Sequence, residues 1–306
     1  MYEKPPAMKI GFIGTPSLSG QLFHPVNGKY EVSGIFSGTA AAEKGLKMYS
    51  SAEALIGGSD VLFISRNAPE AFEAGKMAVK EARHLFIESA FSMEPDQLEE
   101  LYGLSEESRS MVYLGQPLPY HPLYVHLRKS LYPGLILIRI DSAAQYRSKE
   151  AMQQLWFDVA SLVYDAVPYG VRRTGVHIVH NPQDARVPAA CQVRIDFSNG
   201  AQTMVLVNHF TGQEGFMAEF YQEEGRYQLD LYSGKALHYQ VSSGETAEVK
   251  KAAPGWDTLM AESFNSWVEA VLSGRIPLTL NEQGQAVYQL TRELLAQIDY
   301  RKQLFA

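Results

Sequence analysis

The sequence predicts an α/β fold, in which a doubly wound parallel sheet is followed by an α+β domain with a largely antiparallel sheet. Short apolar runs alternate with longer amphipathic runs through residues 8–115, a pattern typical of parallel βα units. A proline-rich segment at 115–122, GQPLPYHP, then interrupts this alternation. Beyond residue 171, successive β-rich runs indicate antiparallel strands. We therefore expect two domains, residues 1–118 and residues 119–306.

Five strands and two helices are predicted in the first domain. Each strand is a short, mostly apolar and partly β-branched run, as expected for strands that are buried on both faces. The five runs are Met8–Gly14, Glu31–Ser37, Val61–Ser65, His84–Glu88 and Met111–Gly115. Apolar residues at helical spacing behind Pro69 predict a helix over 68–83. Pro95 and the acidic residues that follow it predict a second helix over 95–108.

In the second domain, a strand and a long helix precede the β-rich region, and two helices close the chain. The strand is predicted over 135–140 and the long helix over 149–169. The β-rich runs are 190–197, 203–210, 217–221, 227–232 and 236–241. Ser198-Asn199-Gly200 is a hairpin signal between the first two of them. The closing helices are predicted over 256–273, where Gly274 ends the pattern, and over 281–302.

The composition excludes several classes of protein. Hydrophobic residues make up 46% of the chain and charged residues 20%, which is typical of a globular protein and not of a disordered one. The 27 basic residues are outnumbered by 34 acidic ones, so we do not expect nucleic-acid binding. With one cysteine and no apolar stretch of membrane-spanning length, we expect a cytoplasmic protein without a membrane anchor. His177 and His180 have no third ligand at a recognisable spacing, and no metal is predicted.

A glycine-containing turn, GTPSLSG, follows the first strand, at the place where a dinucleotide pyrophosphate binds in Rossmann-type domains. If Gly14 is the first glycine of the G-x-G-x-x-G pattern, Pro16 takes the second place and Ser19 the third. Proline lacks a backbone N–H, so the hydroxyls of Ser17 and Ser19 would replace the lost donors. A simple strand-to-helix turn without a ligand remains an alternative interpretation.

The segment after the second strand bears on the choice of cofactor. NAD enzymes usually carry an Asp or Glu here for the ribose hydroxyls. This chain instead has Ser37-Gly38-Thr39, with Lys44 and Lys47 nearby. The pattern favours NADP slightly over NAD if either binds, and the absence of any cofactor remains open.

The stretch from Asp60 through the helix ending at His84 and into Glu88 resembles the third and fourth βα units of a known family. This is the glucose-fructose oxidoreductase and inositol dehydrogenase family, also called Gfo/Idh/MocA, and the spacing matches without a gap. The resemblance continues at Pro122, at Asp158 and Asp165, and at 262–277, and so covers nearly the whole chain.

This resemblance implies that the first domain binds NAD or NADP and that the second binds a sugar, cyclitol or related polyol. Hydride would be transferred at a carbon that bears a hydroxyl or carbonyl group. It also implies a homodimer or tetramer, packed through the open face of the second sheet. The residues expected to line the cofactor site are Gly14, Pro16, Ser17, Ser19, Ser37, Thr39, Ser65, Arg66, Glu88 and Gln116.

The chain departs from the family where chemistry takes place, so it resembles a degenerate member. The family motif E-K-P appears here as Glu88-Ser89-Ala90, and its lysine is lost. The family's Asp, His and Asp on the long helix appear as Asp158, Leu162 and Asp165. Leucine cannot transfer a proton. Because all three positions share one helical face, Asp158 and Asp165, together with Ser89, are the predicted catalytic residues.

Two functional hypotheses follow from these departures. The first is an NAD(P)-dependent oxidoreductase with a rearranged active site. Tyr120 and His121, on the crossing between the predicted domains, are further candidates to reach its substrate. The alternative is a non-catalytic relative, acting as a ligand sensor or as a regulatory or scaffold protein, that has lost the catalytic lysine and histidine.

Overall fold

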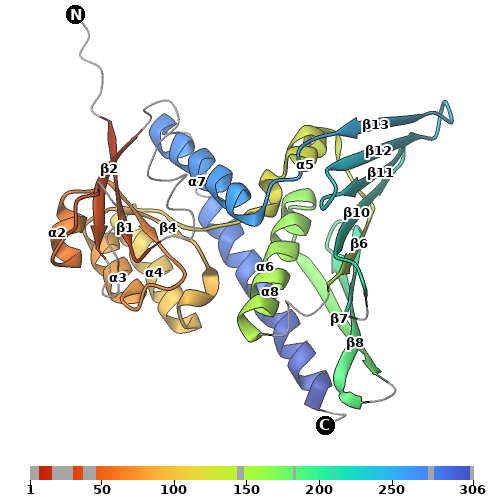
Figure 1. Cartoon of the computed structure of the whole chain (residues 1–306), viewed down its shortest axis with the longest axis horizontal. Helices are drawn as coiled ribbons and strands as arrows, with labels where there is room; N and C mark the ends of the chain where they lie inside the picture. The colour runs from red at the N-terminus through yellow and green to blue at the C-terminus, as the bar shows by residue number, and fades with distance from the viewer. Residues whose placement is uncertain are drawn as a thin grey trace, which may run out of the picture. The chain divides into compact units, whose positions relative to one another are not determined.

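The chain forms two compact units, shown in Figure 1. The computed structural model describes residues 7–15, 30–36, 46–142, 148–181, 184–209, 211–274 and 279–303. The first unit comprises Met1–Pro117 and Trp256–Gln285, and the second comprises Leu118–Gly255 and Ala286–Ala306. The division proposed from sequence, at residue 118, lies at the first crossing between the units. The chain crosses twice more, before Trp256 and after Gln285.

A parallel five-stranded sheet of order β2-β1-β3-β4-β5 forms the centre of the first unit. Its strands are β1 (Met8–Ile13), β2 (Tyr30–Phe36), β3 (Val61–Ile64), β4 (His84–Ile87) and β5 (Val112–Leu114). All four residues of β3 are fully buried, as expected of a sheet that is covered on both faces. Strand order reverses between β1 and β3, so the predicted doubly wound sheet is confirmed.

Helices cover one face of this sheet. They are α2 (Ala52–Gly57), α3 (Ala71–Lys80) and α4 (Pro95–Ser108), and a short 3₁₀ turn, η2 (Ala90–Ser92), follows β4. Helix α4 has the predicted bounds, with Pro95 in its first turn and a reciprocal cap between Glu94 and Gln97. The prediction that the preceding helix begins at Ala68 was wrong. Residues 66–70 form turns before α3 begins at Ala71.

Helix α7 (Trp256–Ser273) covers the other face, although it is more than 140 residues distant from β5 in sequence. Phe264 packs edge-on against Phe63 and Phe86, with ring centroids 5.2 and 5.0 Å apart. Trp267 stacks on Tyr113 at 6.0 Å. This aromatic cluster is the core of the first unit on that side. The first unit is therefore a three-layer α/β/α sandwich whose second helical layer comes from the C-terminal part of the chain.

The second unit contains an eight-stranded sheet of order β13-β12-β11-β10-β6-β9-β8-β7. Its strands are β6 (Leu135–Asp141), β7 (Val171–Asn181), β8 (Asp184–Phe197), β9 (Gln202–Asn208), β10 (Gly215–Gln222), β11 (Gly225–Asp230), β12 (Lys235–Gln240) and β13 (Thr246–Lys250). All neighbours are antiparallel except β6 and β9, so the largely antiparallel sheet is confirmed. The hairpin predicted at Ser198-Asn199-Gly200 joins β8 to β9, and Gly200 adopts a φ of 89°.

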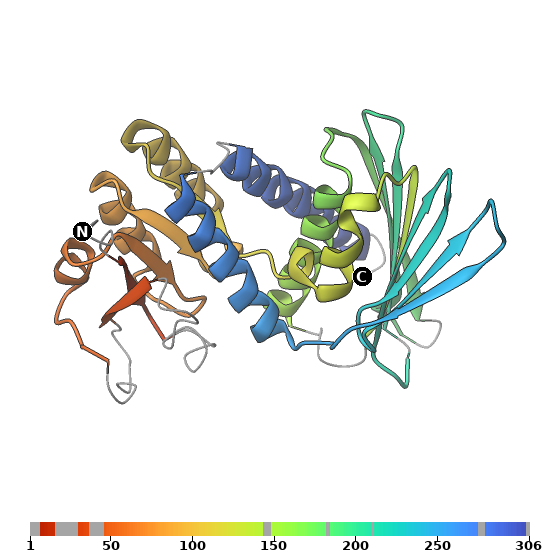
Figure 2. The ribbon, with the colours of Figure 1, turned by 90° about the horizontal axis from the view of Figure 1, so that it is seen from above.

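Helices lie on one side of this sheet, as Figure 2 shows for α6. They are α5 (Pro122–Leu127), α6 (Lys149–Ala166) and the part of α8 (Thr279–Gln303) that belongs to the second unit, and the 3₁₀ turns η3 (Leu118–Tyr120) and η4 (Arg128–Ser130) flank α5. The predicted end of α6 at Tyr169 was wrong, because Val167 precedes Pro168 and leaves the helical conformation. In the part of the chain described above, no helix is both long and apolar enough to span a membrane.

Candidate functional site

The carboxyl ends of the parallel strands in the first unit bring the predicted cofactor residues into one row. In each case, the residue after a strand donates its backbone N–H to the last carbonyl of the neighbouring strand. These hydrogen bonds are Ser65 N to Ile13 O at 2.9 Å, Glu88 N to Ile64 O at 2.9 Å and Gly115 N to Ile87 O at 2.8 Å. The sheet thus places Ser65, Glu88 and Gly115 along the edge where ligands bind in open α/β folds.

Gly14 and Ser65 form the first part of this row. Gly14 adopts a φ of +77°, a conformation that favours glycine. A Cβ at this position would lie 2.2 Å from Ser65 Oγ and 2.9 Å from Ala68 Cβ, so no side chain fits. Ser65 is fully buried, and its hydroxyl has no hydrogen-bond partner among the residues that the structure describes.

Five of the predicted cofactor residues lie outside the described residues, and their prediction stays open. They are Pro16, Ser17, Ser19, Ser37 and Thr39.

Glu88 and Arg66 form the charged centre of the row. Glu88 is fully buried, and its Oε2 accepts a hydrogen bond of 2.9 Å from the backbone N–H of Arg66. The guanidinium Nη2 of Arg66 lies 3.5 Å from Glu88 Oε1. On another side, the guanidinium carbon of Arg66 lies 4.3 Å from the ring centroid of Trp256, at the start of α7. Sequence reasoning placed Arg66 and Glu88 in the site, but it did not identify Trp256.

Ser89 and Gln116 complete the predicted set in the first unit. The Ser89 hydroxyl accepts a hydrogen bond of 3.4 Å from Phe91 N and thereby caps the 3₁₀ turn η2. Gln116 follows Gly115 and is only 4% exposed. Both residues therefore lie at the carboxyl ends of β4 and β5, and their roles remain predictions.

In the second unit, helix α6 presents Asp158, Leu162 and Asp165 at the predicted spacing. Asp158 is 6% exposed, and its Oδ1 accepts a hydrogen bond of 2.7 Å from Gln154 Nε2. Asp165 Oδ2 accepts a hydrogen bond of 2.7 Å from the hydroxyl of Tyr124, on α5. Leu162, between them, is 1% exposed. Each carboxylate is thus held by a neutral donor in a largely buried setting.

Burial raises the pKa of Asp165 above its ordinary value of 3.8, although the hydrogen bond from Tyr124 and the charge of Arg128 act in the opposite direction. A raised pKa means that the folded state binds the proton of this carboxyl more tightly than the unfolded chain does. The stability contributed by this group is therefore complete below pH 3.8 and is lost as the pH rises through the pKa of the folded state.

We expect the variant Asp165→Asn to remove this pH dependence. The free energy of unfolding of the variant, relative to that of the parent protein, should rise from about pH 4 upward and then level off. Urea denaturation at a series of pH values measures this difference. Asp196→Asn is the matched control. The hydrogen bond from Arg194 lowers the pKa of Asp196, so the free energy of unfolding of this variant, relative to that of the parent, should fall as the pH rises. Parallel pH curves for Asp165→Asn and the parent would contradict the prediction.

His121 has a structural role in the second unit. Its Nδ1 accepts a hydrogen bond of 3.3 Å from Leu123 N and so caps α5. Its Nε2 is 3.0 Å from the carbonyl oxygen of Leu231, which fixes the tautomer that carries a proton on Nε2. Burial lowers the pKa of His121. The ring is thus neutral and both nitrogens are occupied, so His121 does not suit the substrate-binding role considered from the sequence.

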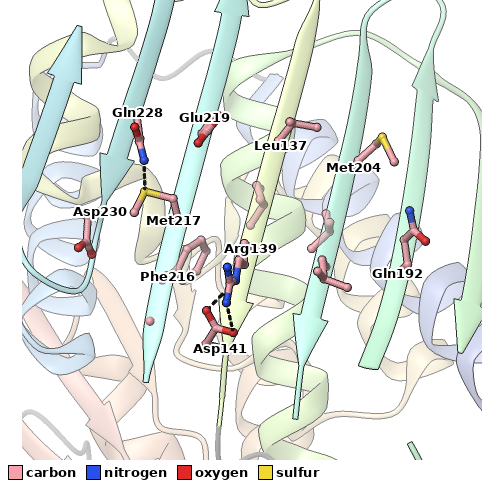
Figure 3. Close-up of a pocket in the computed structure, with 14 residues that line it drawn as sticks. Leu137, Arg139, Asp141, Gln192, Met204, Phe216, Met217, Glu219, Gln228 and Asp230 are labelled. Carbon is pink, nitrogen blue, oxygen red and sulfur yellow. Dashed lines mark hydrogen bonds and ion pairs between the residues drawn. The ribbon is translucent and has the colours of Figure 1, made fainter. Parts of the chain in front are cut away.

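A hollow of about 590 Å³ lies on the second sheet, over strands β6, β8, β9, β10 and β11. Figure 3 shows Arg139 and Asp141 pointing toward each other on β6, where Nε and Oδ2 are 2.8 Å apart. Asn208 Nδ2 donates a second hydrogen bond, of 2.9 Å, to Asp141 Oδ1. Leu206, which also lines the hollow, is 39% exposed. Within the described ranges, no three His, Cys, Asp or Glu side chains are grouped so that they could hold a metal ion.

Comparisons with known proteins identify relatives of the whole fold. No family model matches the sequence. A UDP-N-acetylglucosamine 3-dehydrogenase from Acidithiobacillus ferrooxidans is 24% identical over 194 residues, which cover 58% of this chain and 61% of the relative's length. The crystal structure of that dehydrogenase, called GnnA, superimposes with a TM-score of 0.80 at 15% identity, covering 95% of this chain and 97% of its own.

Two further solved structures share the fold. A dehydrogenase (MviM) from Clostridium difficile has a TM-score of 0.79 at 15% identity, covering 94% of this chain and 99% of its own. GenD2 from gentamicin A biosynthesis, solved in complex with NAD, has a TM-score of 0.73 at 14% identity, covering 95% and 94%. The predicted fold class is therefore confirmed over nearly the whole chain.

Proposed function

We propose that this chain, which resembles the Gfo/Idh/MocA family in sequence and in fold, is an NAD(P)-dependent oxidoreductase that acts on a sugar. The observation that carries the proposal is the row of Gly14, Ser65, Arg66 and Glu88 along the carboxyl ends of β1, β3 and β4. The curated relative and the solved structures described above support it, because each is named as a dehydrogenase or, in the case of GenD2, was solved in complex with NAD.

The described residues fit a dinucleotide. Gly14 forms the tight turn at the end of β1 with a φ of +77° and packs closely against Ser65 and Ala68, as expected of the first glycine of a pyrophosphate-binding turn. The buried Ser65 hydroxyl, which lacks a partner among the described residues, offers a donor next to it. Glu88, Arg66 and Gln116 extend the row toward β5. NADP is the preferred cofactor in this proposal, since the sequence Ser37-Gly38-Thr39 carries no carboxylate for a ribose hydroxyl.

A dinucleotide held by this row would supply the nicotinamide as hydride acceptor for the oxidation of a carbinol carbon of the sugar. The protein must then take up the hydroxyl proton, and the family's histidine is replaced by Leu162. We assign this proton to the carboxylates of α6, and first to Asp165, because its raised pKa brings it closer to the working pH. Asp158 is the second candidate. The Ser89 hydroxyl has a polar positioning role in this scheme, because an alcohol is too weak a base to take the proton.

The test is a calorimetric titration of the purified protein with NAD, NADH, NADP and NADPH separately. We expect micromolar binding, tighter for NADPH than for NADH. Turnover is then followed by the appearance of reduced nicotinamide, with UDP-N-acetylglucosamine as the first substrate and free sugars and polyols as comparisons. Failure of all four nucleotides to bind would contradict the proposal. It would leave the non-catalytic sensor or scaffold, which the named relatives do not favour.

The oligomeric state is part of the same proposal. The outer face of the second sheet carries exposed apolar residues, with Val179 44% and Leu206 39% exposed, together with the ion pairs Arg139–Asp141 and Arg194–Asp196. Such a mixed face is complementary to a second copy of itself. We propose that it forms the interface of a homodimer or tetramer in the cytoplasm. A monomeric mass by light scattering would contradict this interface.

A further inference from the structure

Arg66 is held in place on two sides in the first unit. The buried carboxylate of Glu88 accepts the Arg66 backbone N–H at 2.9 Å and lies 3.5 Å from its Nη2. The Trp256 ring lies under the guanidinium at 4.3 Å. A guanidinium fixed in this way loses little conformational entropy when it binds a further acceptor.

Two nitrogens of this guanidinium make no hydrogen bond within the described residues, although one of them, Nη2, forms the ion pair with Glu88. Nε and Nη2 of Arg66 are shielded from solvent and donate no hydrogen bond to any residue in the described ranges. A shielded N–H without an acceptor costs free energy, so its presence in a native structure calls for an acceptor from elsewhere. The fully buried Ser65 hydroxyl precedes Arg66 and is also without a partner in the described part of the chain. Adjacent unsatisfied donors at a ligand-binding edge point to the oxygen atoms of a ligand.

The strand order places Arg66 relative to the two halves of a dinucleotide. In a doubly wound sheet the pyrophosphate lies at the switch point, here between β1 and β3, and the adenosine ribose lies toward the end of β2. Arg66 follows β3 and bonds to Glu88 after β4, on the opposite side of the switch point. It therefore lies on the side of the nicotinamide ribose. At the next strand end, Ser89 stands where the family resemblance places a lysine.

We propose that Arg66 supplies the cation that this site has lost at Ser89, and that its guanidinium donates hydrogen bonds to an oxygen of the nicotinamide-ribose half of the bound dinucleotide. The inference rests on the proposed function and deepens it. Arginine keeps its proton at all working pH values, so Arg66 binds and orients the cofactor and does not act as acid or base. Glu88 and Trp256 are positioning residues that act through Arg66.

The experiment compares two ligands by calorimetry. One is the reduced dinucleotide that the parent protein binds more tightly. The other is its adenosine half alone, AMP for NADH or adenosine 2′,5′-bisphosphate for NADPH. We expect Arg66→Gln to weaken dinucleotide binding by about 10- to 100-fold and to leave the adenosine half unchanged. Arg66→Lys should recover part of the lost dinucleotide affinity, since lysine keeps the positive charge but lacks the planar guanidinium group.

Lys76→Gln is the matched control, because it removes one positive charge from the same unit at an ion pair on α3 with Glu100. It should leave both affinities unchanged. Thermal unfolding of each variant monitors its folding, and Trp256→Leu, which retains Arg66 but removes the ring beneath it, should weaken dinucleotide binding in the same direction.

Four results distinguish the proposals. Unchanged dinucleotide affinity in Arg66→Gln would overturn the role of Arg66, as would an equal loss for the dinucleotide and for the adenosine half. If the parent protein binds the adenosine half and no dinucleotide, the proposed oxidoreductase function fails as well. Binding of the dinucleotide by the parent with a selective loss in Arg66→Gln supports both.

Discussion

Replacement of Phe264 by alanine is expected to lower the free energy of unfolding of the first unit by about 3–5 kcal/mol, the largest effect on stability that we predict. Phe264 is fully buried and contacts three aromatic rings of the sheet, those of Tyr30, Phe63 and Phe86. Neighbouring side chains cannot move into the space that the phenyl ring leaves, because the cluster is held between β-strands and a helix. The cavity therefore persists in the folded variant.

Urea denaturation followed by tryptophan fluorescence measures this effect. The ring centroids of Trp267 and Phe264 are 6.3 Å apart, so the fluorescence of Trp267 reports on the same cluster. Leu272→Ala is the matched control on the same helix. Leu272 is 46% exposed, so its truncation should change stability by no more than about 0.5 kcal/mol. Equal effects of the two substitutions would mean that α7 does not form the second layer of the first unit.

The largest expected effect on activity is that of Asp165→Asn. If Asp165 takes up the hydroxyl proton, its replacement should lower kcat for sugar oxidation by about 10²- to 10⁴-fold. The asparagine keeps the size of the side chain and can still accept a hydrogen bond from Tyr124. Dinucleotide affinity should therefore remain unchanged. Steady-state kinetics and calorimetry together measure the two quantities.

A second variant makes this test sharper. The hydrogen bond from Tyr124 lowers the pKa of Asp165, so Tyr124→Phe should raise that pKa. Because the base must be ionised to act, the acidic limb of the kcat/KM profile should move to higher pH in Tyr124→Phe. Glu150→Gln, at an exposed position on the same helix, is the control. If Asp165→Asn retains full kcat while Asp158→Asn loses it, the proton belongs to Asp158.

The local part of the fold was predictable from the sequence. The five parallel strands were predicted because their apolar runs are short and bounded by turn residues, and α4 was predicted because Pro95 marks its first turn. The register of the strands and the choice of neighbouring strand were harder to predict from the sequence. The parallel pairing of β6 with β9 leaves no mark in either strand, because an alternating pattern is the same for parallel and antiparallel neighbours.

The same limit applies to the candidate site. Glu88, Ser65 and Gly14 could be placed because each is the last residue of a predicted strand. Trp256 and Tyr124 could not, since each contacts its partner, Arg66 or Asp165, only through tertiary folding. The helical stripe of α7 predicts that one of its faces is buried, but it does not reveal which sheet receives that face.

The discontinuous first unit has a consequence for biosynthesis on the ribosome. The five strands are complete once β5 has been made, but one face of their sheet stays without Phe264 and Trp267 until α7 emerges. At ordinary elongation rates, synthesis of residues 118–255 takes on the order of ten seconds. During this interval the face of the nascent sheet that includes Phe63 and Phe86 lacks its aromatic partners from α7. The second unit can meanwhile complete its strands, but it also waits for its own part of α8, so neither unit is expected to reach its native state before the C-terminal part of the chain has been made.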